Sequence, residues 1–140
     1  MQLDAYPEQL LDTAVHNALD HNQTIDLTTT GRRSGQPRRI EIYLHNLAGR
    51  LVISGIPARR TRAWIHNIAA DPRITIHLKG PYATADLVAT ARIVIDPAER
   101  RELIAGVARN WRRTDLDTMV EHSPLIVVTI AGYGDATAAA

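Results

Sequence analysis

Hydrophobic and polar side chains alternate along several stretches of the chain, a pattern typical of β-strands that bury one face. The clearest stretch is 38–46, in which Ile40, Ile42 and Leu44 share one face while polar side chains occupy the other. Other stretches, rich in β-branched residues and separated by glycine and proline, also indicate β-strands. We therefore predict six strands, at 23–30, 38–46, 50–54, 73–79, 83–95 and 124–131.

Three further stretches place their apolar residues at helical spacing, three or four positions apart. Pro7 suits the first turn of the first helix, Thr61 is the predicted N-cap of the second, and Pro97 begins the third. Asp71 and Pro72 end the second helix. The predicted helices cover residues 7–21, 61–70 and 97 to about 112.

The predicted elements follow the order helix, three strands, helix, two strands, helix, strand. Short turns between neighbouring strands favour an antiparallel sheet, and closure into a barrel removes the exposed sheet edges. With 140 residues, the chain fits one domain that has its own hydrophobic core. We predict an α+β fold, with a single domain at 1–134 built as a six-stranded antiparallel β-barrel with flanking helices, and a disordered Ala-rich tail at 135–140.

The composition excludes several classes of protein and site. The chain has no cysteine, which excludes disulfides, thiolate zinc sites and cysteine nucleophiles. No apolar run approaches the roughly 20 residues that cross a bilayer, and the N-terminus lacks the basic and apolar regions of a secretory signal, so we expect no membrane span and a cytoplasmic location. The six histidines lack the paired spacing of metal ligands, and we expect no metal.

The net charge of +1 conceals a strong segregation of charged residues. Residues 1–31 contain five acids and neither Lys nor Arg, whereas residues 32–62 contain eight arginines and one acid, Glu41. The remaining residues, 63–140, carry eight bases and nine acids. Because the positive charge is local, it indicates an anionic ligand more than a general affinity for nucleic acid.

The first part of the arginine-rich region is a loop, 30–39, which reads Thr-Gly-Arg-Arg-Ser-Gly-Gln-Pro-Arg-Arg. Its glycines, Gly31 and Gly35, let the backbone turn sharply and bring N–H groups close to an anion. Guanidinium groups bind phosphate or carboxylate through two parallel hydrogen bonds. A second basic segment, 59–62, lies where a helix is predicted to begin, and helix N-termini attract anions. The two basic loops therefore predict one anionic ligand bound between them.

Two motifs carry a resemblance to a known family. Residues 27–38 read Leu-Thr-Thr-Thr-Gly-Arg-Arg-Ser-Gly-Gln-Pro-Arg, and residues 64–72 read Trp-Ile-His-Asn-Ile-Ala-Ala-Asp-Pro. At this spacing they resemble the deazaflavin (F420)-dependent nitroreductase family. That family resembles a wider split β-barrel superfamily that includes flavin-binding pyridoxamine-phosphate-oxidase-like proteins. The similarity extends from about Asp26 to Val128, nearly the whole predicted domain.

The resemblance implies a split β-barrel that holds coenzyme F420, a deazaflavin with a phosphodiester and an oligoglutamate tail. In the family, the loop at 31–35 lies near the phosphate and tail. The segment before the Trp helix, together with the Trp and Asn on that helix, lies near the phosphate and ring. The cofactor-binding residues implied for this chain are Arg32, Arg33, Ser34, Gly35, Arg38, Arg59, Arg60, Trp64 and Asn67. Residues 54–62 depart from the Ser-Asn-Gly-Gly segment of many relatives. Because this segment shapes the ring pocket in the family, the resemblance does not identify the substrate.

The implied function is an F420-dependent oxidoreductase, nitroreductase-like, that transfers a hydride between the deazaflavin and a small organic acceptor. Tyr43 and His66 are the side chains considered as proton donors, beside water. Two alternatives stay open: an FMN- or tetrapyrrole-binding member of the same barrel, and a non-enzymatic domain that binds anions or nucleic acid. The last lacks the aromatic interleaving of such domains, since the chain has no Phe. Barrels of this kind often pair, so a homodimer is also expected.

Overall fold

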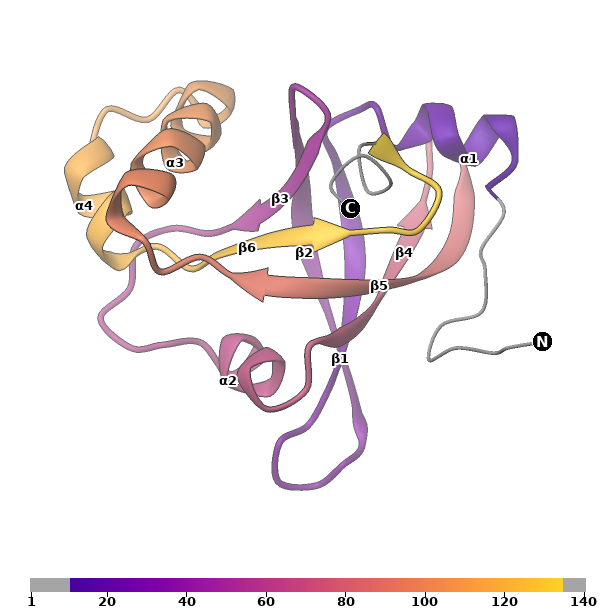
Figure 1. Ribbon diagram of the computed structural model, residues 1–140, viewed down its shortest axis with the longest axis horizontal. Coiled ribbons are helices and arrows are strands. Elements are labelled where there is room, and N and C mark those ends of the chain that lie inside the picture. Colours follow the sequence, from indigo (N-terminus) through magenta and orange to yellow (C-terminus); the bar gives the residue numbers. More distant parts are fainter. Residues whose placement is uncertain (1–10, 135–140) are drawn as a thin grey trace.

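The six strands pair antiparallel in the order β1-β2-β3-β6-β5-β4, and β4 pairs with β1 to close a barrel (Figure 1). The computed structural model describes residues 11–134, so the predicted tail at 135–140 lies outside the described residues. The strands are β1 (Gln23–Thr30), β2 (Pro37–Leu47), β3 (Arg50–Ser54), β4 (Arg73–Lys79), β5 (Thr84–Ile93) and β6 (Leu125–Thr129). The predicted α+β barrel is confirmed, although β5 and β6 are shorter at both ends than predicted.

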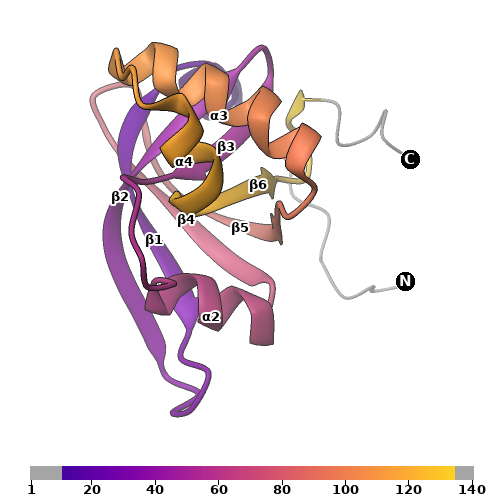
Figure 2. The same cartoon turned by 90° about the vertical axis from the view of Figure 1, so that its left-hand side faces the viewer.

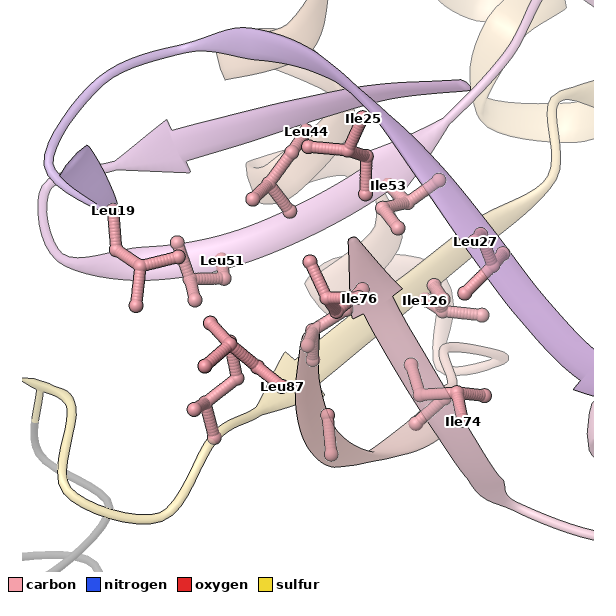
Figure 3. Close-up of a cluster of buried hydrophobic side chains, with 14 of the residues drawn as sticks. Leu19, Ile25, Leu27, Leu44, Leu51, Ile53, Ile74, Ile76, Leu87 and Ile126 are labelled. Atoms are coloured by element: carbon pink, nitrogen blue, oxygen red, sulfur yellow. The ribbon is translucent and has the colours of Figure 1, made fainter. Parts of the chain in front are cut away.

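Alternate residues of the strands point into the barrel, where aliphatic side chains from all six strands pack together (Figure 3). Ile25, Leu44, Ile53, Ile76 and Ile126 are each fully buried there. Each such side chain contributes about 1.5–3 kcal/mol relative to an exposed one, so this cluster is a main source of stability. The alternation in the sequence follows from this geometry, because every second residue of a strand faces the same side.

Helices α1 (Thr13–Ala18) and α2 (Ala63–Ala70) cover opposite ends of the barrel. Helix α1 precedes the first residue of β1, and its Ala18 joins the barrel cluster together with Leu19, the residue after its last turn. Helix α2 lies at the far end of β1 and adds Trp64 and Ile68 to the same cluster. The barrel interior is therefore closed at both ends by helices that contribute apolar side chains.

The first helix is shorter than predicted. Residues 11 and 12 are not helical, and residues 7–10 lie outside the described part of the chain. Asp12 is the N-cap, since its carboxylate accepts a hydrogen bond of 2.8 Å from the Val15 amide, and this cap fixes where the helix begins. The helix ends at Ala18, whose carbonyl accepts a hydrogen bond of 2.7 Å from the buried Gln23 side chain.

The predicted N-cap of the second helix is wrong. The cap of α2 is Arg62, not Thr61, and no side chain makes a cap hydrogen bond there. The Arg62 carbonyl accepts hydrogen bonds from the amides of Ile65 and His66, which places the first helical residue at Ala63. A threonine one residue earlier is therefore too far back along the chain to cap the helix.

Helices α3 (Pro97–Trp111) and α4 (Leu116–His122) lie side by side outside the barrel (Figures 1 and 2). They form a second apolar cluster on the outer face of the sheet, which includes Val52, Leu103, Ile104, Val107 and Met119. The third helix is confirmed close to its predicted bounds. Helix α4 was not predicted, because a seven-residue segment with several polar residues carries little helical periodicity of its own.

None of the helices between residues 11 and 134 is long and apolar enough to cross a lipid bilayer. Within the same residues, no three His, Asp or Glu side chains come together in a group that could hold a metal ion.

His45 is fully buried on the outer face of β2, beneath α3. Its Nδ1 lies 2.9 Å from Nδ2 of Asn110, and its ring packs 4.8 Å from the ring of Trp111. Burial lowers the pKa of His45 from 6.5 to about 4, because the charged imidazolium loses its solvation. The folded protein therefore holds a neutral histidine across a pH range in which an unfolded chain would bind a proton.

We expect the free energy of unfolding to fall as the pH is lowered from 6.5 to about 4, since protonation of His45 favours the unfolded chain in this window. The contribution of this one group has a slope of about 1.4 kcal/mol per pH unit and a total of up to about 3 kcal/mol. Urea unfolding of wild type and His45→Asn at several pH values measures it. The variant should show a shallower dependence, and equal slopes would contradict the prediction.

Candidate functional site

The loop between β1 and β2 extends beyond the barrel, past α2 (Figures 1 and 2). The Gly31 amide donates to the Gln36 carbonyl over 2.8 Å, and the Gly35 amide donates to the Gly31 carbonyl over 2.8 Å. Gly35 has a φ of 71°, in the left-handed region. A Cβ on Gly31 would lie only 2.6 Å from Oγ of Ser34. Gly35 is therefore required by its backbone conformation, and a side chain at Gly31 would displace Ser34 and crowd the Gln36 carbonyl at 3.2 Å.

Asn67 of α2 ties this loop to the end of the barrel. Its Oδ1 accepts a hydrogen bond of 3.0 Å from the Arg32 amide, and its Nδ2 donates one of 3.0 Å to Oγ1 of Thr29. The Asn67 side chain is buried, so its bond to Thr29 is shielded from water and its bond to the Arg32 amide is partly shielded. A residue distant in sequence thus sets the position of the arginine-bearing loop.

The loop, the start of β2 and one face of α2 enclose a pocket of about 440 Å³, called here the hairpin pocket. Six of the nine residues predicted to bind a cofactor line it: Arg32, Arg33, Ser34, Arg38, Trp64 and Asn67. Further lining residues that were not nominated are Thr29, Gly31, Arg39, Ile40 and Ala63. Gly31 and Arg39 belong to the basic loop, and Thr29 belongs to the threonine run before it. These three pocket residues could therefore have been nominated from the sequence motif.

Positive charge in the hairpin pocket is only partly balanced by the protein. Arg39 pairs with Asp26 over 2.9 Å, and hydrogen bonds from Lys79 and Arg39 lower the pKa of that carboxyl. Arg38 donates a hydrogen bond of 3.3 Å to Oγ of Ser34 and has no carboxylate partner among the described residues. Within residues 11–134, the guanidinium groups of Arg32 and Arg33 have no carboxylate partner. The pocket therefore presents exposed cations that can bind an anion without breaking an existing ion pair.

Five arginines elsewhere in the described chain pair with acids. Arg92 forms a two-bond pair with Glu99, with distances of 2.7 and 3.0 Å. Arg113 pairs in the same way with Asp115, and Arg101 contacts Asp117. Among the same described residues, Arg32 and Arg33 have no such pair and line one pocket together, so their guanidinium groups offer a site for an anionic ligand.

Three of the predicted cofactor-binding residues lie outside the hairpin pocket. Gly35 lines a hollow of about 460 Å³ that also includes Thr28 and Thr30 of β1. Arg59 and Arg60 line a third hollow, of about 340 Å³, beside the end of α4. The sequence indicated two basic loops facing one ligand, whereas the structure places their arginines in separate pockets.

The two side chains considered as proton donors also lie apart from the hairpin pocket. Tyr43 packs on the outer face of β2, where its ring lies 5.0 Å from that of His45 and 6.2 Å from that of Trp111. It is five residues beyond Arg38, about 17 Å along an extended strand. His66 is exposed on α2, and it lines none of the three hollows described above. Their proton-donor roles stay predictions, and this geometry does not favour them.

A family model described as F420H(2)-dependent quinone reductase matches residues 5–131. The chain belongs to this family. Membership confirms the resemblance carried by the loop and Trp–Asn motifs. It indicates an F420-dependent reductase, an oxidoreductase, and coenzyme F420 as the cofactor rather than FMN or a tetrapyrrole.

Solved structures share the fold of this family member. One described as F420 reductase is 18% identical, covers 92% of this chain and 98% of its own, and has a TM-score of 0.60. A conserved hypothetical protein from Mycobacterium tuberculosis is 17% identical, with coverage of 100% and 94% and a TM-score of 0.65. A pyridoxinephosphate oxidase family protein from Clostridium acetobutylicum, related to general stress protein 26, is 17% identical, with coverage of 81% and 80% and a TM-score of 0.58.

The residues of the hairpin pocket fit the acidic parts of such a cofactor. Arg32, Arg33 and Arg38 offer guanidinium donors for phosphate and carboxylate, and Ser34 adds a hydroxyl donor. The first turn of α2 has no side-chain cap, and its Ala63 and Trp64 line the pocket, so the positive end of the helix dipole adjoins the pocket and favours an anion there. This donor set supports anion binding but contains no acid–base dyad.

Proposed function

We propose that this family member uses coenzyme F420 to reduce a small organic acceptor, with quinones as the acceptor class that the family description suggests. The observation that carries the proposal is the hairpin pocket, in which Arg32 and Arg33 face solvent without carboxylate partners among residues 11–134. Exposed, unpaired guanidinium groups can bind the phosphodiester and the acidic tail of F420. Reduction of nitro compounds stays a prediction alongside quinones.

In this proposal, the protein binds the cofactor and orients it. When bound, coenzyme F420 supplies the hydride donor, and the chemistry of hydride transfer belongs to the cofactor. Arg32, Arg33 and Arg38 would hold its phosphate and carboxylates, while Asn67 fixes the loop that carries the first two of these arginines. Trp64, largely buried, forms part of the pocket wall and keeps water from one side of it.

The interaction partners follow from the same assignment. A small molecule is the expected substrate, and the segregated arginines are assigned to the cofactor rather than to nucleic acid. A homodimer stays a prediction from the sequence, and sedimentation velocity at several protein concentrations would test it.

Titration of the purified protein with oxidised F420, FMN and a short oligonucleotide tests the proposal. We expect F420 to bind and the variant Arg32→Ala/Arg33→Ala to bind it about tenfold or more weakly, since two charge-assisted contacts are lost. Affinity should also fall as salt is raised, because exposed charges are screened. The control is Arg109→Ala, an exposed arginine on α3 that lines none of the three hollows.

Three results would contradict the proposal. They are tight FMN binding without any F420 response, preferential binding of the oligonucleotide, and equal losses in the Arg32/Arg33 and Arg109 variants. If F420 binds as expected, turnover of a soluble quinone and of a nitroaromatic compound with reduced F420 distinguishes the two acceptor classes.

A further inference from the structure

The hollow beside the end of α4, called here the α4 pocket, lies between the segment 58–62, the first turn of α3 and the start of β6. Its walls are held together by hydrogen bonds. The Ala58 amide donates to the His122 carbonyl over 3.1 Å, and Oγ of Ser54 donates to the Pro124 carbonyl over 2.6 Å. The volume of about 340 Å³ is within the range of small-molecule pockets.

Four arginines line the α4 pocket, against one acid, Glu121. Arg59 and Arg60 are exposed and have no carboxylate partner within residues 11–134. Arg62 donates to the Ile56 carbonyl over 2.9 Å, which neutralises no charge. The pocket thus carries an excess of positive charge that the described chain leaves unbalanced.

Arg100 differs from the other three because its position is fixed. Its guanidinium donates to the carbonyls of Val94, Val120 and Ser123, at 3.0, 2.8 and 2.6 Å. A guanidinium has five N–H groups, so two remain for another acceptor. Burial lowers the pKa of Arg100, which shows that its charge is partly desolvated without a carboxylate nearby. An anion in the pocket would relieve this cost.

Apolar side chains stand beside these cations. Ile95 lines the pocket and is 81% exposed, the highest value among the large hydrophobic residues in the described part of the chain. Ile65 and Ile93 line the same pocket. A ligand that joined a hydrocarbon part to an anionic head would cover Ile95 and balance the arginines together. A wholly polar anion such as phosphate would leave the isoleucines in water.

We propose that the α4 pocket binds an amphiphilic anion, with its carboxylate or similar head held by Arg59, Arg60 and Arg100 and its apolar body against Ile95. This site is separate from the proposed cofactor site. Helix α2 divides the two, since its Trp64 and Asn67 line the hairpin pocket while Ile65 lines the α4 pocket. Successive helical residues point about 100° apart, which explains how one helix lines both.

Calorimetric titration of the full chain with octanoate tests the proposal, with octanol as an uncharged probe of the same length. We expect octanoate to bind and octanol to bind much more weakly. Arg59→Ala/Arg60→Ala should weaken octanoate about tenfold or more and leave octanol unchanged, because only the charged head loses its contacts. Ile95→Ser should weaken octanoate through the apolar wall. Both substitutions are at exposed positions, so the fold should persist.

The control variants are Arg32→Ala/Arg33→Ala and Arg109→Ala, both of which should bind octanoate like wild type. Addition of F420 should leave octanoate affinity unchanged, and this result is independent of whether F420 is the cofactor. Octanol binding as tight as octanoate, an unaffected Arg59/Arg60 variant, or displacement of octanoate by F420 would each overturn the proposal.

Discussion

Replacing Trp64 with alanine is expected to lower the free energy of unfolding by about 3–5 kcal/mol, among the largest losses for any single substitution in the chain. Trp64 is 7% exposed and belongs to the barrel cluster, so its removal leaves a cavity where α2 closes the barrel. The measurement is urea unfolding followed by circular dichroism. Trp64→Phe is the matched control, since it retains an aromatic ring in the core and should lose much less.

The same substitution separates packing from binding. Trp64 lines the hairpin pocket, so we expect Trp64→Ala to lose F420 affinity even under conditions in which it is folded. Trp64→Phe should retain more of both properties. A Trp64→Ala protein that unfolds at the wild-type urea concentration would show that α2 does not close the barrel through this residue.

Asn67→Leu is expected to lower both stability and F420 affinity. Leucine has a similar size but cannot hydrogen bond, so it leaves the Arg32 amide and the Thr29 hydroxyl without their partner. An unpaired buried polar group costs about 1–3 kcal/mol. Released from α2, the loop would also lose the position in which Arg32 and Arg33 face the pocket.

Asn67→Asp distinguishes the two effects. A carboxylate can still accept from the Arg32 amide and from the Thr29 hydroxyl, so this variant should be more stable than the leucine variant. It adds a negative charge to the lining of the pocket. Asn67→Asp should therefore bind F420 as weakly as Asn67→Leu, or more weakly. Urea unfolding measures the stability of Asn67→Leu and Asn67→Asp, and titration with F420 measures the affinity of each variant. Equal F420 binding by wild type and Asn67→Asp would count against an anion in this pocket.

The local features of the fold could be predicted from the sequence. All six strands were found from alternation and from glycine and proline breaks, because a strand between two turns shows its buried face directly in the sequence. The short α4 was not found, and Thr61 was mistaken for an N-cap. The first error is a missed helix whose formation depends on packing against the outer apolar cluster, and the second is a misplaced helix start.

The candidate site was predicted in part. The loop 31–39 and the residues Trp64 and Asn67 were identified from motifs, and the structure brings most of them into one pocket. The roles considered for Tyr43 and His66 depended on which way each side chain points, and that direction is set by the barrel and by α2. Similarly, the hydrogen bonds of Asn67 join residues more than thirty positions apart, which no local pattern reveals.

An antiparallel α+β barrel and an arginine-rich glycine loop suited to an anion could be inferred from the amino-acid order alone, because period-two burial, tight turns and clustered charge are local properties. The division of the arginines between two pockets emerges from the folded arrangement. Closure of the barrel brings α2 against the loop, and α2 lies between the two pockets, with Arg32 and Arg33 lining one and Arg59 and Arg60 lining the other. Contacts between distant segments set that arrangement, and they exist only once the chain has folded.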